Sequence, residues 1–290
     1  MTSNPTRREF LRQSSIVAAG LTAMRAAEPA SAAGKSNAMP TIKLGDLEVS
    51  RLFMGSNPFF GFAHKPGNLG REMRSYYTDE RIIEVLEAAA DQGITAVWTP
   101  CYDRWIKVWN KYRDQDGKLK IWIGQPDPMP DKMKEHITLA AENGAKAICI
   151  QGLRIDVQIR AGRFDVVRDW LEYVKSYDLP AGMATHRPET HLLAEEKKLP
   201  TDFYHQCFYQ PENYSDEVRE QAITTIKQLE KPVVGYKVLA AGRLSAEEGF
   251  GYAFKHLRRK DGVCVGLYPP QKPDQITEDA GLARKLTSES

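Results

Sequence analysis

Short apolar runs alternate with amphipathic stretches along most of the chain. The amphipathic stretches predict helices near residues 78–92, 104–113, 131–143, 162–177, 188–197, 214–229, 245–259 and 273–286. The helical spacing is clearest in the first of them, where Ile82, Ile83 and Leu86 recur on one face. The apolar runs predict strands at residues 52–55, 96–99, 120–124, 147–151, 181–185, 203–209, 233–238 and 263–267.

This regular alternation decides the fold class. Eight strand-then-helix units follow one another in about 235 residues, a pattern typical of parallel strands joined by helices. Ahead of them, residues 41–44 and 47–49 predict a small hairpin around Gly45 and Asp46. A doubly wound open sheet is the alternative, but no G-x-G-x-x-G motif follows the first strand. The sequence therefore predicts one α/β domain over residues 41–290, a (β/α)8 TIM barrel with an N-terminal β-hairpin.

The N-terminus has the features of an export signal. Residues 6–11 read TRREFL, a weakly apolar run spans residues 14–27, and Ala30-Ser31-Ala32 offers a cleavage site. The arginine pair is typical of twin-arginine signals, so residues 6–11 are expected to contact that export machinery. An ordinary basic N-terminus would not explain all three features together. We expect a signal peptide at 1–32, a linker at 33–40 and a periplasmic or extracellular mature protein, without a stable membrane span.

Charge and cysteine content narrow the class further. The chain holds 40 basic and 38 acidic residues, and removal of the signal takes away four arginines and two glutamates, leaving 36 of each. A neutral mature chain has no overall field for nucleic acid, so a small-molecule partner is expected. The cysteines show no C-x-x-C spacing and are expected to be small buried apolar residues. They are Cys101, Cys149, Cys207 and Cys264.

Several short motifs occur in a familiar order. They are TIKLGDLEVSRL at 41–52, Gly-Ile at 93–94, HQC at 205–207 with Gln-Pro at 210–211, GYKVL at 235–239 and QITED at 275–279. In this order and spacing the mature chain resembles the aldo/keto reductase superfamily along essentially its whole length. The resemblance implies a TIM barrel, an NADPH cofactor and carbonyl reduction by an aspartate, a tyrosine, a lysine and a histidine.

The catalytic positions of that family are replaced in this chain. The aspartate position holds Trp98, and the tyrosine position holds Asp103, with Tyr102 one residue away. The lysine position holds Gln125 and the histidine position holds Gln151. A tyrosine phenol has a pKa near 10 and is a poor acid at neutral pH without a cation beside it. These replacements argue against ordinary carbonyl reduction.

The cofactor positions are partly retained. Gln206 matches the glutamine that the resemblance places at the nicotinamide carboxamide, and Tyr236 matches the aromatic ring on which the nicotinamide stacks. His186 replaces an asparagine of that site, and Lys237 replaces a small hydroxyl residue. The loop at 266–273 is rich in proline, which removes N–H donors for phosphate. NADPH is therefore possible but disfavoured.

The functional side chains that could replace the reductase residues are expected at the C-terminal ends of the strands. Histidine titrates near neutrality and a carboxylate can orient it, whereas a buried lysine can attack a carbonyl. A divalent metal held by His186, Asp103, His64 or Asp127 is a further possibility, and His136, His205 and His256 are expected on helices or toward the outer shell. The predicted catalytic residues are His186, Asp103, Tyr102 and Lys237, and the predicted substrate-binding residues are Asn57, Trp98, Gln125, Gln151 and Arg154.

These observations favour an exported aldo/keto reductase-like barrel without NADPH redox chemistry. Aromatic walls with amides and carboxylates around them suit a small polar or sugar-like carbonyl compound. Such a site could catalyse non-redox acid–base chemistry such as isomerisation or elimination. Two alternatives stay open: a diverged NAD(P)-dependent oxidoreductase and a non-catalytic binding protein.

Overall fold

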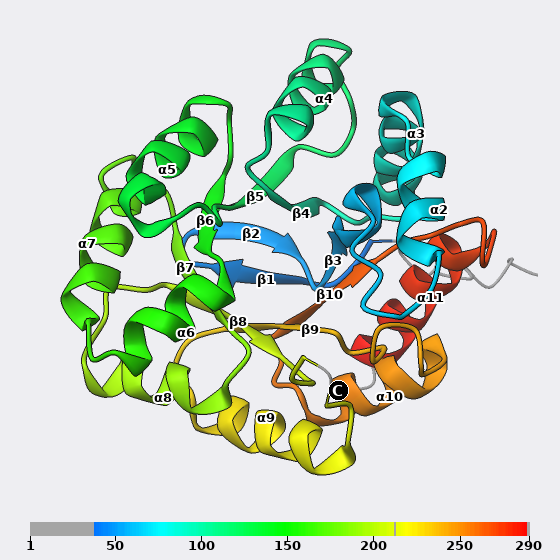
Figure 1. The fold of residues 1–290 in the computed structure, drawn as a ribbon. Coiled ribbons are helices and arrows are strands. Elements are labelled where there is room, and N and C mark those ends of the chain that lie inside the picture. The colour runs from blue at the N-terminus through cyan, green and yellow to red at the C-terminus, as the bar shows by residue number, and fades with distance from the viewer. Residues whose placement is uncertain (1–37, 212, 289–290) are drawn as a thin grey trace, which may run out of the picture. The chain divides into compact units, whose positions relative to one another are not determined.

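The computed structural model describes residues 38–211 and 213–288 (Figure 1). The expected signal at 1–32 and residues 33–37 of the expected linker lie outside these described residues. Parallel strands close into a barrel in the order β10-β3-β4-β5-β6-β7-β8-β9, which confirms the predicted TIM barrel. The strands are β3 (Leu52–Gly55), β4 (Ala96–Pro100), β5 (Ile121–Gln125), β6 (Ala147–Ile150), β7 (Ala181–Thr185), β8 (Phe203–Cys207), β9 (Val233–Tyr236) and β10 (Gly262–Gly266).

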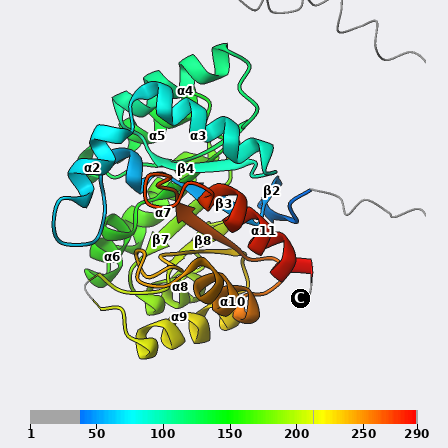
Figure 2. The same cartoon turned by 90° about the vertical axis from the view of Figure 1, so that its right-hand side faces the viewer.

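Helices surround the barrel, as Figures 1 and 2 show. The predicted helices are confirmed as α3 (Asp79–Asp91), α4 (Asp103–Asp114), α5 (Met133–Glu142), α7 (Phe164–Lys175), α8 (Pro188–Glu196), α9 (Asp216–Gln228), α10 (Ala246–His256) and α11 (Gln275–Ser288). Two short 3-10 helices, η1 (Asn57–Phe60) and η2 (Pro130–Lys132), lie in the loops after β3 and β5. No helix within the described residues is both long and apolar enough to cross a membrane.

The structure contains two helices that the sequence pattern did not predict, α2 (Leu69–Tyr76) and α6 (Gly152–Arg160). Helix α6 follows β6 almost directly, because Gln151 serves as its N-cap and accepts a hydrogen bond from the backbone N–H of Arg154 at 3.2 Å. Glutamine is not among the residues that usually cap helices, so this start carries no common sequence signal. The predicted strand at 147–151 is therefore one residue too long.

The N-terminal hairpin closes one end of the barrel. Strands β1 (Thr41–Leu44) and β2 (Leu47–Ser50) pair antiparallel around Gly45, whose φ of +60° suits a residue without a side chain. Ile42, Leu44 and Val49 pack into the same apolar cluster as the residues inside the barrel. With this end covered by the hairpin, the opposite end, where the strands have their carboxyl termini, is the end left for a site.

All four cysteines are buried and unpaired, which confirms the expectation that they act as small apolar residues. Cys149 and Cys264 belong to the cluster inside the barrel. Burial raises the pKa of the Cys101 thiol, with a smaller effect of the nearby Asp127 carboxylate, and burial likewise raises the pKa of Cys149. These thiols are therefore poor nucleophiles, because the thiolate is the reactive form.

A buried carboxylate ties strands β9 and β10 together at the closed end. The Asp261 side chain is fully buried and pairs with the Arg258 guanidinium at 2.7 Å. It also accepts the backbone N–H of Val233 at 2.9 Å and that of Arg258 at 2.9 Å. Arg51 donates to the Asp261 carbonyl at 2.9 Å. This network satisfies buried polar groups of three segments at once.

Replacing Asp261 with alanine is expected to lower the free energy of unfolding by about 3 kcal/mol, because Arg258 and the Val233 N–H lose their acceptor. Urea denaturation of both proteins measures this loss. The matched control is Glu84→Ala, which removes an exposed ion pair with Arg81 and should cost less than about 1 kcal/mol. Equal effects of the two substitutions would contradict the role given to Asp261.

Candidate functional site

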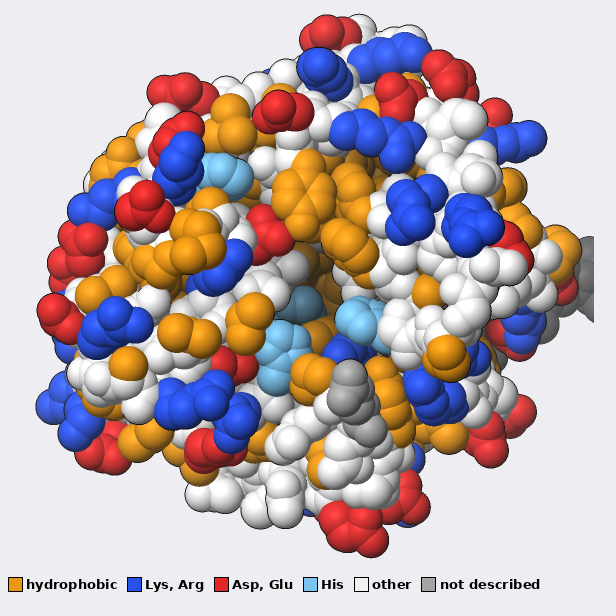
Figure 3. All heavy atoms as spheres, in the orientation of Figure 1, with side chains coloured by type: hydrophobic (Ala, Val, Ile, Leu, Met, Phe, Trp, Pro, Cys, Tyr) orange, Lys and Arg blue, Asp and Glu red, His pale blue; other side chains and the backbone are white. Residues whose placement is uncertain are grey.

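A cavity of about 330 Å³ opens at the carboxyl ends of the barrel strands. Figure 3 shows it as a hollow near the centre of the molecule, where histidine side chains gather beside hydrophobic ones. Its floor lies inside the barrel, on β4, β7, β8, β9 and β10, and its walls come from the loops that follow the strands. Its position matches the end at which TIM barrels place their active sites.

The floor is built around three aromatic rings in contact, tilted by 31° and 44° to one another and called the ring stack below. The His205 imidazole lies between the Trp98 ring, with centroids 3.9 Å apart, and the Tyr236 ring, with centroids 4.3 Å apart. His205 is 5% exposed, and neither of its ring nitrogens has a hydrogen-bond partner within the described residues. Burial, helped by the nearby His191 and His186, lowers the pKa of His205 well below its ordinary value, so the ring is neutral. The expectation that His205 faces the shell was wrong.

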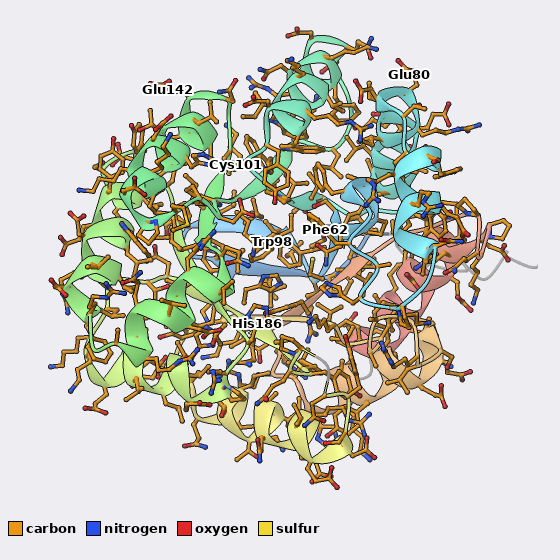
Figure 4. All side chains as sticks on the ribbon, in the orientation of Figure 1. Phe62, Glu80, Trp98, Cys101, Glu142 and His186 are labelled. Atoms are coloured by element: carbon orange, nitrogen blue, oxygen red, sulfur yellow. The ribbon has the colours of Figure 1, made fainter. Side chains whose placement is uncertain are left out.

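Trp98 occupies the position where the resemblance has a catalytic aspartate. Its ring contacts Phe53 and Phe203 edge-on, with centroids 5.8 and 5.9 Å apart, and so fills the barrel interior below the cavity. Its indole Nε1 is buried without a partner within the described part of the chain. The replacement therefore exchanges an ionisable group for a packed ring with one N–H donor. Trp98 and His186 are both labelled in Figure 4, near the axis of the barrel.

His186, directly after β7, forms a dyad with Asp156 of α6. Its Nδ1–H donates to Asp156 Oδ2 at 3.2 Å, and its backbone N–H donates to the same oxygen at 3.0 Å. The other carboxylate oxygen accepts from Thr185 and, at 3.2 Å, from Thr190. Because Asp156 holds Nδ1, the free nitrogen of this cavity-lining ring is Nε2.

Asp156 stays charged although it is buried. Burial acts to raise the pKa of its carboxyl, but hydrogen bonds from His186 and Thr185 outweigh that effect and lower it overall. Gly152 makes room for the dyad, because a Cβ there would lie 3.1 Å from both Cε1 and Nδ1 of His186. Asp156 is not among the predicted site residues, because the sequence pattern does not predict α6. The signal that could have found it is the apolar pair Ile155 and Ile159, at helical spacing around Asp156.

The wall on the opposite side joins two loops that are far apart in sequence. Lys65 Nζ donates to the Gly242 carbonyl at 2.6 Å, which links the loop after β3 to the loop after β9. Asn57 Nδ2 donates to His64 Nε2 at 3.2 Å. Desolvation in the cavity, followed by electrostatic effects of Lys237, His186 and Arg243, lowers the pKa of His64 to about 4.

Seven of the predicted site residues line this one cavity. Gln125 and Gln151 stand at the ends of β5 and β6, and the other five surround the floor and the mouth. The seven are Asn57, Trp98, Gln125, Gln151, His186, Tyr236 and Lys237.

The remaining predicted residues lie outside the cavity lining. Asp103 is exposed at the first position of α4. Tyr102 donates its hydroxyl to Asp127 at 2.7 Å, and Arg154 Nε donates to the Asp127 carbonyl at 3.0 Å. Burial and the hydrogen bond to Asp127 raise the pKa of Tyr102, which makes it a weaker acid. Gln206 alternates with the inward-facing His205 and therefore faces the helical layer, where it donates to the Cys207 carbonyl at 2.9 Å.

The described residues do not fit NADPH in the way that the resemblance implies. Gln206 is directed away from the cavity, so it cannot hold a nicotinamide carboxamide there. Tyr236 lines the cavity, but its hydroxyl donates to the Thr185 carbonyl at 2.8 Å and its ring lies against His205. No three His, Cys, Asp or Glu side chains of the described chain form a group that could hold a metal ion.

Comparisons with known proteins support the fold. No family model matches the sequence. No curated protein matches it either. Among solved structures, a candidate aldo-keto reductase from Pseudomonas aeruginosa matches at a TM-score of 0.60 and 16% identity, over 85% of this chain and 94% of that one.

Two other matches are synthases. N-acetylneuraminic acid synthetase from Leptospira borgpetersenii serovar Hardjo-bovis has a TM-score of 0.54 and 11% identity, over 87% of this chain and 90% of its own. A truncated 3-deoxy-D-arabino-heptulosonate 7-phosphate synthase from Thermotoga maritima has a TM-score of 0.51 and 14% identity, over 88% and 91%. At these identities the likeness establishes the fold of TIM-barrel enzymes and nothing finer.

The neutral state of His205 makes stability depend on pH. Its pKa in the folded chain lies below the unfolded value near 6.5, so the stabilisation is present above pH 6.5 and declines as the pH falls below it. His205→Phe should keep the ring stack and remove this loss. Between pH 6.5 and 5, wild type should lose about 1–2 kcal/mol more than the variant in chemical denaturation. Equal losses would show that His205 is not held neutral.

Proposed function

We propose that this chain is an enzyme of acid–base chemistry that acts on a small polar carbonyl compound. One observation carries the proposal: the Asp156–His186 dyad presents a ring to a cavity of about 330 Å³. A carboxylate that orients one nitrogen of an imidazole leaves the other free to accept a proton near neutral pH.

The proposed reaction is removal of a proton from the carbon next to a carbonyl. His186 Nε2 takes the proton, and the electron pair of the broken C–H bond moves into the carbonyl to give an enolate. Return of the proton to the same or the neighbouring position gives an epimer or an isomer. Departure of a group from the β carbon gives an elimination instead. No oxidant or reductant takes part.

The floor offers hydrogen-bond donors that can stabilise the enolate oxygen. A neutral imidazole can donate a hydrogen bond to a developing oxyanion, and the Trp98 indole N–H offers a second donor. Both rings are fixed by the aromatic stack, so the donors need not reorganise during the reaction. Amides of Asn57, Gln125 and Gln151 line the same cavity and suit the hydroxyl groups of a sugar-like substrate.

We also propose that the chain is a divergent relative of the aldo/keto reductase superfamily that has exchanged redox chemistry for this function. The ordered sequence motifs support this descent, and the fold agrees with it. A diverged oxidoreductase is the second candidate, favoured by Tyr236 on the cavity floor. Saturable NADPH binding at physiological concentration, measured by fluorescence titration of the mature chain, would favour that candidate over ours.

His186→Asn should slow deuterium exchange at the α carbon of a small ketone by at least about 100-fold, because the proton acceptor is lost. Asp156→Asn should slow it by about 10- to 100-fold, because the ring loses its orienting charge. Proton NMR of pyruvate, pyruvamide, dihydroxyacetone and dihydroxyacetone phosphate in D2O measures the rate. His256→Asn, the same change on α10 outside the cavity, is the matched control.

Two outcomes would contradict the assignment. Exchange that survives His186→Asn at the wild-type rate would remove this residue from the proposed chemistry. Exchange by none of the probes at any concentration would contradict proton abstraction next to a carbonyl. Thermal unfolding of each variant shows whether a lost rate reflects a lost fold.

Export is proposed on the sequence alone, since residues 1–32 lie outside the described structure. Arg7→Lys together with Arg8→Lys should keep the protein in the cytoplasmic fraction of a bacterial host, because the arginine pair is the recognition feature. Arg12→Lys is the matched control and should leave export intact. Cell fractionation and mass spectrometry of the N-terminus measure both effects, and export of the double variant at the control level would contradict the proposal.

A further inference from the structure

The cavity is lined by basic and neutral side chains. The basic residues on its walls and floor are His64, Lys65, His186, His205 and Lys237, and none of the described lining residues is an aspartate or a glutamate. Figure 3 shows histidine side chains and a basic side chain together in the hollow. The carboxylate of Asp156 touches the site only from behind His186 and is already hydrogen-bonded on both oxygens.

Among the described residues, Lys237 is the cation of this wall whose side chain has no hydrogen-bond or ion-pair partner. Lys65 bonds to the Gly242 carbonyl, and Arg243 bonds to the Ala240 carbonyl and lies over the Tyr214 ring at 3.9 Å. Lys237 forms neither an ion pair nor a side-chain hydrogen bond within the described residues, although it lines the cavity and is only partly exposed. An unpaired ammonium group in a concave site attracts an anion.

The backbone at Lys237 is also unusual. Its φ is +57°, in the left-handed region that residues with a side chain rarely adopt. This conformation is energetically unfavourable and is found mainly where the surrounding structure or a functional role maintains it. Lys237 directly follows Tyr236, the last residue of β9, whose ring forms part of the floor. The end of β9 therefore positions both a floor ring and the cation.

The floor of the cavity carries buried polar atoms that could bind an uncharged part of a ligand. His205 is more than nine-tenths buried and lines the cavity, and neither of its ring nitrogens has a partner among residues 38–211 and 213–288. Within the same residues, the buried Nε1 of the neighbouring Trp98 has no partner either. Buried polar groups of this kind favour a ligand that brings a hydrogen-bonding oxygen to them. Since His205 is neutral, the oxygen on the floor need not carry a charge.

We infer that the cavity binds a small organic anion, with its carboxylate or phosphate group at Lys237 and an uncharged oxygen on the floor at His205 and Trp98. This inference rests on the proposed function and names its substrate class, a carbonyl compound that carries an acidic group. A volume of about 330 Å³ lies at the lower end of the range for ligand pockets, so the compound has few carbon atoms.

Calorimetric titration of the mature chain with two matched pairs of probes tests the inference. Pyruvate is compared with its neutral amide, pyruvamide, and dihydroxyacetone phosphate is compared with dihydroxyacetone. In at least one pair the charged member should bind about 10-fold more tightly or better, because it pairs with a partly desolvated ammonium group. The pair that shows the preference identifies the acidic group as carboxylate or phosphate.

Three variants test whether Lys237 is the cation that binds the charged group of the probe. Lys237→Gln should abolish the preference for the charged probe, whereas Lys237→Arg should retain most of it. Lys107→Gln, the same change at an exposed position of α4 outside the cavity, should leave the preference unchanged. Thermal unfolding confirms that each variant is folded before it is titrated.

The outcomes separate this inference from the proposed function, because binding is measured without turnover. Tight binding of an anion by both wild type and His186→Asn, without any deuterium exchange, would support the inference and contradict the proposed reaction. Equal affinity for charged and neutral probes, binding of none of them, or a preference that survives Lys237→Gln would overturn the inference.

Discussion

The need to fill the barrel interior governs the rest of this structure. Eight parallel strands enclose a space that must be packed, and here a ring stack of Trp98, His205 and Tyr236 fills its upper part. The stack spans β4, β8 and β9 and rests on apolar residues that the hairpin covers from below. Because the rings close the barrel at this level, they also form the floor of the cavity. One packing solution therefore sets both the stability of the interior and the depth of the site.

The same constraint explains why a change at one position alters the chemistry available. A tryptophan at residue 98 cannot ionise, and its bulk presses against His205. That histidine is thereby buried and neutral, so the floor offers hydrogen bonds without net charge. The ionisable groups therefore lie at the rim of the cavity, where Asp156 orients His186. The site is thus divided into an uncharged floor, a proton acceptor on one side and cations on the other.

The dyad depends on the short path between β6 and α6. The helix begins immediately after the strand, which brings Asp156 behind the end of β7, and Gly152 leaves space for the imidazole. Asp156 is buried, so its charge is tolerable only because His186, Thr185 and Thr190 satisfy its oxygens. Solved structures at 11 to 16% identity share the barrel, yet they say nothing about such a pair, since fold alone does not define chemistry.

The sequence by itself determined the alternation of strands and helices, the hairpin and the burial of the cysteines, because these follow from local apolar periodicity. It also found seven residues of the cavity, since strand ends meet at one end of a barrel. Only the tertiary structure decided that His205 faces inward and Gln206 outward. Every residue of β8 is buried, so its pattern cannot distinguish the two faces. Asp156 likewise required the structure, because its role arises from a contact with a residue thirty positions away.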